Sequence, residues 1–211
     1  MVRSQDSTGT TKSPGVLSRE EEVSNRPPNL SATLPSMTPN RRLYLLCGPS
    51  LSGKSTLARR MVDELGVAVV SADAINERRG FPFGLEGMPE SAWAEILGSQ
   101  IQELSAAMAR GVPVAIDDTA CYRWLRDRFR DEAASGGYEL RLVYVPGARE
   151  EILARRERLA RSKERPVLSR ERLLDHLDRF EPPQEDEPHV AIRTEGDLRK
   201  FLEDEERGDP R

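Results

Sequence analysis

Eight consecutive residues of this chain have the types and the spacing that hold a phosphate group. They match the pattern G-x-x-x-x-G-K-[ST] at each defined position and are Gly48, Pro49, Ser50, Leu51, Ser52, Gly53, Lys54 and Ser55. The glycines let the backbone curl so that successive amides face phosphate oxygens, and the Lys54 ammonium reaches the β- and γ-phosphates. The Ser55 hydroxyl can ligate Mg²⁺, and a helix beginning here, with Thr56 in its first turn, adds its positive dipole end. The pattern therefore predicts a site for a nucleoside triphosphate and Mg²⁺. Because the chain has no Asn-Lys-x-Asp guanine signature, we expect ATP.

A triphosphate site also needs a carboxylate on the metal side, and Asp117 and Asp118 are the candidates. Both follow the Val/Ile-rich run 112–116, which is typical of an acid at the end of a buried strand. Side chains alternate along a strand, so only one of the two is expected to face the metal, and we favour Asp118. The alternative is that Asp118 or Thr119 caps the next helix.

Asp73 is a third acidic candidate, just past the apolar run 67–70. A carboxylate in this position can accept the proton of an attacking hydroxyl or hold that hydroxyl in line with the γ-phosphate. The alternative is that Asp73 caps a helix that starts at Ala74. One side chain can serve in both roles.

A predicted helix over 149–162 carries arginines at helical spacing, namely Arg155, Arg158 and Arg161. Such a face favours a lid whose arginines neutralise the transferring phosphoryl group. Two alternatives are a solvated helix laced with Glu/Arg pairs and a nucleic-acid surface. Few aromatic residues accompany the arginines, which argues against a base-stacking platform. We expect Pro166 to end the helix and to provide a hinge.

Short apolar runs alternate with helical segments along the chain. The predicted strands are 41–47, 67–70, 112–116, 138–145 and 189–193, and the predicted helices are 55–65, 90–110, 122–134, 149–162, 169–180 and 195–206. This alternation predicts an α/β fold, a five-stranded parallel sheet with helices on both faces. Ligands bind such sheets at the carboxyl ends of the strands, and each acidic or phosphate-binding motif above lies at such an end.

Composition limits the remaining possibilities. Residues 1–40 contain no aromatic residue and many Ser, Thr and Pro, which predicts a disordered tail before a folded domain at 41–207. No run approaches the roughly 18 apolar residues that a membrane helix needs, and the N-terminus has no apolar segment typical of a secretory signal. Cys47 and Cys121 are too few for a metal motif and fit small buried side chains in a reducing cytoplasm. The net charge of −4 shows no basic excess that would favour nucleic acid.

With these motifs the chain resembles the AAA_33 group of P-loop kinases, which includes polynucleotide kinase, zeta toxin and chloramphenicol phosphotransferase. The resemblance covers residues 42–205 and rests on the order of several segments, which are 48–56, 71–73, 116–119, 155–158, 180–183 and 192–195. It implies a P-loop NTPase fold with an Arg-rich helical lid and ATP-dependent phosphorylation of a hydroxyl. In that case Lys54 and Ser55 bind ATP and Mg²⁺, Asp73 is the base, and Arg155 or Arg158 acts from the lid.

Three functions remain open from the sequence. The first is a kinase for a small-molecule or nucleoside-like hydroxyl, for which the aromatic residues Phe81, Phe83, Trp93, Tyr122 and Trp124 are candidate pocket residues or ordinary core and surface residues. The second is a 5′-hydroxyl polynucleotide kinase, although Arg78 and Arg79 stand further from Asp73 than the corresponding arginine of those enzymes. The third is an ATP-binding switch without an acceptor.

Overall fold

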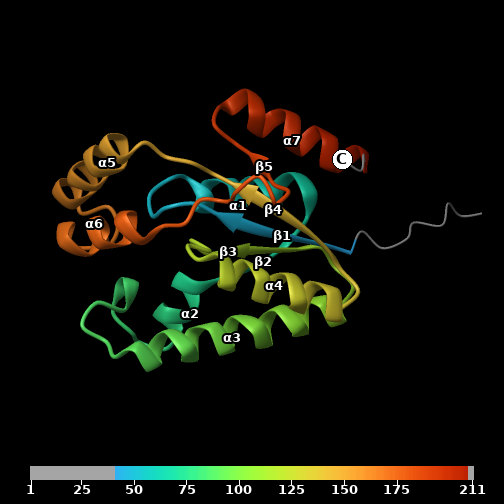
Figure 1. The fold of residues 1–211 in the computed structure, drawn as a ribbon, viewed down its shortest axis with the longest axis horizontal. Coiled ribbons are helices and arrows are strands. Elements are labelled where there is room, and N and C mark those ends of the chain that lie inside the picture. The colour runs from blue at the N-terminus through green and yellow to red at the C-terminus, as the bar shows by residue number, and fades with distance from the viewer. Residues whose placement is uncertain (1–40, 209–211) are drawn as a thin grey trace, which may run out of the picture. The chain divides into compact units, whose positions relative to one another are not determined.

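Five parallel strands form one sheet in the computed structural model, which describes residues 41–208 (Figure 1). The strand order is β2-β3-β1-β4-β5, which confirms the predicted five-stranded parallel sheet. The strands are β1 (Arg42–Cys47), β2 (Ala68–Ser71), β3 (Val114–Asp117), β4 (Glu139–Tyr144) and β5 (Val190–Ala191). The predicted disordered tail, 1–40, lies outside the described residues.

The register of the sheet brings the candidate motifs together at one edge. Asp117, the last residue of β3, lies opposite Leu46 of β1 and Ser71 of β2. Since parallel strands end at the same edge, the segments that follow β1, β2 and β3 start side by side. The phosphate loop, Asp73 and the Asp117–Asp118 pair are therefore neighbours in space.

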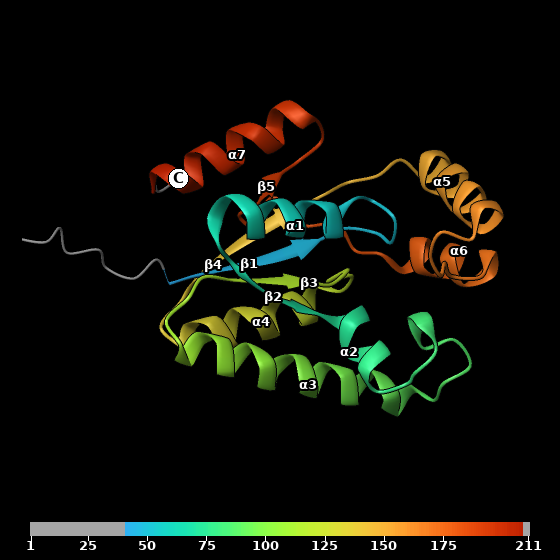
Figure 2. The ribbon, with the colours of Figure 1, turned by 180° about the vertical axis from the view of Figure 1, so that it is seen from behind.

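Helices cover both faces of the sheet, as the alternating pattern predicts (Figures 1 and 2). Leu43 and Leu45 of β1 pack with α3 (Glu90–Ala109) and α4 (Arg123–Ser135) on one face. The intervening Tyr44 and Leu46 pack with α1 (Lys54–Leu65) and α7 (Glu195–Arg207) on the other. All six residues of β1 are buried, because a central strand has a layer on each side. No helix within residues 41–208 is long and apolar enough to cross a membrane.

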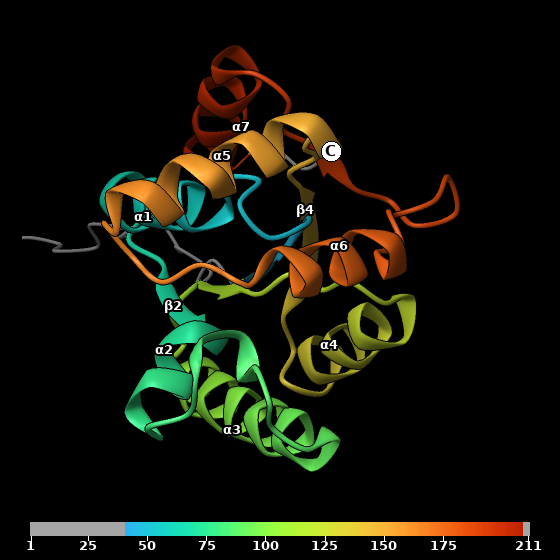
Figure 3. The same ribbon diagram turned by 90° about the vertical axis from the view of Figure 1, so that its left-hand side faces the viewer.

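Three further helices lie beyond the carboxyl ends of the strands (Figure 3). They are α2 (Ala72–Arg78), α5 (Arg149–Ser162) and α6 (Arg170–Arg179), and we refer to α5 and α6 as the lid helices. The prediction that Pro166 ends α5 is wrong. The helix ends at Ser162, and its C-cap Lys163 adopts a left-handed conformation (φ 53°) and donates its amide to the Leu159 carbonyl.

Candidate active site

The phosphate loop joins β1 to α1, and its first glycine has no room for a side chain. A Cβ at Gly48 would lie 2.2 Å from the Val145 carbonyl oxygen. The Gly48 amide donates to the Thr119 carbonyl oxygen at 3.0 Å, which attaches the loop to the segment after β3. At the other end, α1 begins after Gly53 with no side-chain cap. The first amides of this helix are thus placed to bind an anion, as the glycine pattern predicts.

Lys54 is buried within this loop, with only 7% of its surface exposed. Its ammonium donates to the Pro49 carbonyl oxygen at 2.8 Å. Burial lowers the pKa of Lys54, while the nearby carboxylates of Asp117, Asp118 and Asp73 oppose that effect. The lysine therefore shares one charge cluster with all three candidate acids.

The structure gives different partners to the two acids at the end of β3, Asp117 and Asp118. The Ser55 hydroxyl donates to the Asp117 carboxylate. Burial raises the pKa of Asp117, and this hydrogen bond partly offsets the rise. Asp118 instead accepts from Gln100 Nε2 at 2.9 Å and from the Ala120 amide at 2.9 Å, so both of its oxygens have protein partners. These contacts favour Asp117 over Asp118 as the metal-facing acid, because Asp118 is bonded to α3 and to its own loop.

A hydroxyl beside a carboxylate is a donor set that suits Mg²⁺. Magnesium takes one or two protein oxygens and completes its shell with phosphate and water. In residues 41–208 no group of three or more His, Cys, Asp or Glu could hold a metal alone. Ser55 and Asp117 therefore fit a metal that arrives with a nucleotide.

Asp73 lies in the first turn of α2 and is not its cap. The cap is Ser71, whose Oγ accepts from the Ala74 amide at 3.4 Å. The Asp73 side chain reaches solvent, yet surrounding protein raises its carboxyl pKa, and the Asp117 and Asp118 carboxylates raise it further. A carboxyl group with a raised pKa beside a lysine is suited to take a proton.

The lid helices contact this cluster through residues only partly foreseen. Arg155 Nη1 donates to the Leu51 carbonyl oxygen of the phosphate loop at 2.6 Å. Arg165, beyond the end of α5, lies near enough that its charge lowers the pKa of both Asp73 and Asp117. Arg158 is exposed and makes no hydrogen bond or ion pair within residues 41–208. The geometry favours Arg155 and Arg165 over Arg158.

His176 of α6 is a site residue that sequence reasoning missed. Its Nε2 accepts the Ser50 amide of the phosphate loop at 3.1 Å, and its ring lies 6.2 Å from that of Phe180. Burial, with the Lys54 charge, lowers the pKa of His176 to about 4, so the ring is neutral and able to accept. No motif joins a histidine on this helix to a loop 126 residues earlier.

The aromatic candidates for an acceptor pocket do not come together. The Tyr122 and Trp124 rings stack at 6.1 Å, while Trp93 and Trp124 are largely exposed. A surface hollow of about 600 Å³ between α3 and α4 includes Trp124 but none of the other four. No residue of the phosphate loop or of the acid cluster lines it, so we do not place the acceptor there.

The sheet order and the phosphate loop define a P-loop nucleoside-triphosphate-binding protein. The chain belongs to the AAA_33 family, whose model, described as an AAA domain, matches residues 43–183. Among curated proteins it is 24% identical over 162 residues to a probable gluconokinase of Schizosaccharomyces pombe, covering 74% of this chain and 81% of that one. It is also 32% identical over 112 residues to a tRNA dimethylallyltransferase of Cereibacter sphaeroides, covering 46% of this chain. The chain spans 35% of the length of that transferase.

Solved structures share the fold at low sequence identity. A gluconokinase from Sinorhizobium meliloti superposes with a TM-score of 0.57 and 20% identity, covering 81% of this chain and 99% of that one. Kti12 from Chaetomium thermophilum in complex with ADP-AlF3 superposes with a TM-score of 0.64 and 17% identity, covering 80% of this chain and 100% of that one. APS kinase of Mycobacterium tuberculosis in complex with AMPPNP and APS superposes with a TM-score of 0.55 and 16% identity, covering 80% of this chain and 97% of that one. The family match and these neighbours support the P-loop fold of the chain.

Proposed function

We propose that this protein transfers the γ-phosphoryl group of Mg-ATP to a hydroxyl of a small-molecule or nucleoside-like acceptor. The observation that carries the proposal is the charge cluster at the carboxyl edge of the sheet. Lys54 of the phosphate loop, Asp117 beside Ser55, and Asp73 of α2 all influence one another's ionisation. A hydroxyl held at Asp73 would thus lie on the phosphate side of the site.

Each residue of this cluster has a role in the proposed reaction. The phosphate loop, residues 48–56, binds the phosphates through Lys54 and the amides at the start of α1. Ser55 with Asp117 would hold Mg²⁺, which supplies neutralisation of phosphate charge. Asp73 accepts the hydroxyl proton while the acceptor oxygen bonds to the γ-phosphorus. The bond from that phosphorus to the bridging oxygen breaks, and ADP leaves. Arg155 and Arg165 supply positive charge from the lid.

Contacts beyond Asp73 favour a small acceptor over a polynucleotide. Arg78 pairs with Glu103 of α3. Arg79 donates to Ser99 Oγ at 2.7 Å and pairs with Glu95 at 3.3 Å. The arginines that follow the proposed base already have partners on α3, which weighs against their binding a nucleic-acid backbone. Several kinases with this fold are named for small substrates, which supports the same choice.

The experiment that tests the proposal is ADP release from Mg-ATP with a panel of hydroxyl acceptors. The panel holds sugars and sugar acids, nucleosides, aminoglycosides and 5′-hydroxyl oligonucleotides. For the acceptor that stimulates release, Asp73→Asn should lower transfer by about 10² or more and leave ATP affinity within a few fold, since only the base is lost. Lys54→Ala, as the control, should abolish turnover of Mg-ATP.

Other outcomes would redirect the assignment. Full transfer by Asp73→Asn would remove Asp73 from the chemistry. Stimulation by oligonucleotides alone would favour the polynucleotide kinase. Tight ATP binding with no stimulation by any acceptor class would favour an ATP-binding switch.

A further inference from the structure

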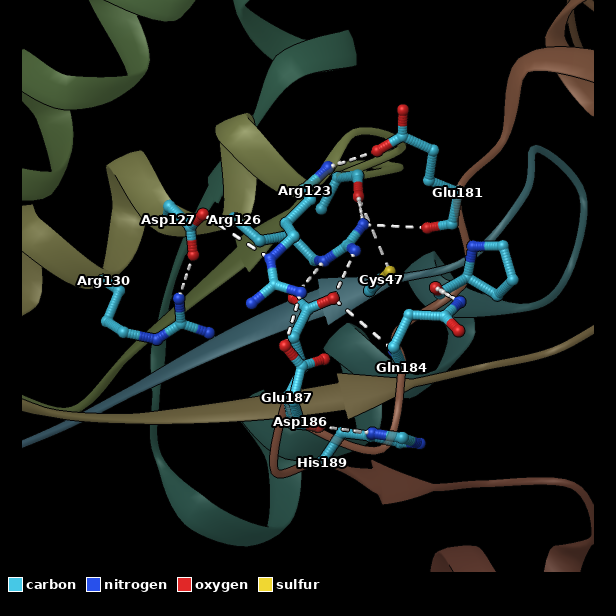
Figure 4. A network of polar contacts seen from close by, with 12 residues as sticks. Cys47, Arg123, Arg126, Asp127, Arg130, Glu181, Gln184, Asp186, Glu187 and His189 are labelled. Atoms are coloured by element: carbon cyan, nitrogen blue, oxygen red, sulfur yellow. Dashed lines mark hydrogen bonds and ion pairs between the residues drawn. The ribbon is translucent and has the colours of Figure 1, made fainter.

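A buried ion pair lies near Cys47, at the carboxyl end of β1 (Figure 4). It contacts the loop of residues 117–121, which we call the acid-bearing loop. Arg126 of α4 pairs with Glu187 through two hydrogen bonds, Nε to Oε1 at 2.8 Å and Nη2 to Oε2 at 2.7 Å. Both side chains are 1% exposed. Two parallel bonds of this kind fix the orientation of the guanidinium.

The remaining arginine nitrogen joins two loops. Arg126 Nη1 donates to the Ala120 carbonyl oxygen at 3.0 Å and to the Glu181 carbonyl oxygen at 2.9 Å. Ala120 belongs to the loop between β3 and α4, and Glu181 to the segment that leads from α6 to β5. The Glu181 amide adds a bond to the Cys121 carbonyl oxygen at 2.9 Å. One guanidinium thus connects the acid-bearing loop to the segment that returns from the lid.

The acid-bearing loop needs such support because its backbone is strained. Ala120 is fully buried with φ 44°, a left-handed conformation that disfavours a residue with a Cβ. Its carbonyl accepts from Arg126 and from Cys47 Sγ, and its amide donates to Asp118. Strain of this kind persists only where the surroundings determine the conformation, and it concentrates at functional sites. The preceding carbonyl, that of Thr119, accepts the Gly48 amide of the phosphate loop.

We propose that Arg126, held by Glu187, is a positioning residue that fixes the loop of residues 117–121 against the phosphate loop. Asp117 thereby keeps its place beside Ser55. The assignment of Asp117 to the metal side rests on the proposed function, whereas the fixing of the loop does not.

The test replaces the pair by apolar residues, Arg126→Met with Glu187→Leu. Removing both charges together leaves no unpaired buried charge, so the variant should fold with a thermal midpoint close to that of the parent. The carbonyls of Ala120 and Glu181 nevertheless lose the Arg126 donor, and Ala120 keeps only the weaker Cys47 Sγ. Hydrogen exchange of the backbone amides in 117–121 should become faster, and the apparent Mg²⁺ affinity in Mg-ADP binding should fall by about 10- to 100-fold, as for residues that orient metal ligands. The affinity for ADP without Mg²⁺ should change by no more than about threefold, because a residue that orients a metal ligand mainly influences the affinity for the metal.

The matched control is the buried pair of Arg42 and Glu205, which joins the amino end of β1 to α7. Arg42→Met with Glu205→Gln should leave exchange in 117–121 and Mg²⁺ affinity at parental values. If the apolar double variant does not fold, Arg126→Lys keeps the charge but cannot reach both carbonyls and Glu187, and it should show the same changes more weakly.

The two measurements distinguish failure of this inference from failure of the proposed function. Unchanged exchange and unchanged Mg²⁺ affinity in a folded variant would overturn the positioning role. If the parent protein bound no Mg-nucleotide, the proposed function would fail, and faster exchange in 117–121 would still support the positioning role. Equal changes in the Arg42–Glu205 variant would show a general loss of stability and would also overturn it.

Discussion

A buried arginine–glutamate pair lies at each end of β1, but one pair connects regular elements and the other connects loops. At the amino end, Arg42 of the strand pairs with Glu205 of α7, and the Tyr44 hydroxyl donates to the same carboxylate at 2.8 Å. All three residues belong to regular elements. At the carboxyl end, Arg126 bonds to Glu187 and to two loop carbonyls.

The difference follows from where a parallel sheet binds its ligands. Strands and helices satisfy their own backbone groups, so the pair at the amino end only closes α7 onto the sheet. Loops after the carboxyl ends must expose some backbone groups to a ligand and cannot satisfy all of them internally. Side chains such as Arg126 therefore take over the bonding that regular structure supplies elsewhere. Breaking each pair separately tests this contrast.

The largest effect is expected from removing one partner of the loop-holding pair. Glu187→Ala leaves Arg126 charged and buried, which should lower the free energy of unfolding by about 3–5 kcal/mol. Glu205→Ala should cost less, because Arg42 keeps a second carboxylate, Glu139, at 3.9 Å. Urea denaturation of the two variants measures the difference, and an equal loss would remove the contrast between the ends.

A second prediction compares the two acids of the carboxyl end. Asp117→Asn should weaken Mg²⁺ in the nucleotide complex by about 10- to 100-fold, because it removes a charged ligand. Asp118→Asn should have a smaller effect, because an amide oxygen can still accept one of the two bonds that Asp118 receives. Titration of Mg²⁺ against ADP binding measures both variants. A stronger effect at Asp118 would restore the preference for Asp118 that we stated from the sequence.

Sequence reasoning was sufficient for the regular elements and insufficient for contacts between loops. Apolar runs predicted all five strands, and the glycine pattern predicted the phosphate loop. The helix α2, with seven residues, is too short for its periodicity to stand out. The alternation of side chains along a strand admits either Asp117 or Asp118, because it does not say which of two successive residues faces the site. Arg126 and Glu187, 61 residues apart, carry no spacing that a sequence pattern could recognise.

The smallest effect concerns the contact between the lid and the phosphate loop. His176 Nε2 accepts a hydrogen bond from the Ser50 amide, which would otherwise be free to donate to a bound phosphate. His176→Phe removes the acceptor while keeping an aromatic ring beside Phe180, so ADP should bind about 2- to 10-fold more tightly, the worth of one neutral hydrogen bond. Calorimetric titration measures the change, with His176→Gln as the control that retains an acceptor. Unchanged or weaker binding by His176→Phe would show that the ring assists the nucleotide instead of competing with it.

His176 also makes the free energy of unfolding depend on pH, and this dependence tests the contact between the lid and the phosphate loop. Its pKa of about 4 in the folded protein lies below the ordinary value of 6.5. The unfolded chain therefore takes up a proton first as the pH falls, and the folded state loses stability between pH 6.5 and 4. His176→Phe lacks this term, so its stability relative to the parent should improve across that window and stay constant above it. The difference between the unfolding free energies of the two proteins isolates His176 together with its interactions with Asp118 and Asp175. A difference independent of pH would show that the ring is not held neutral.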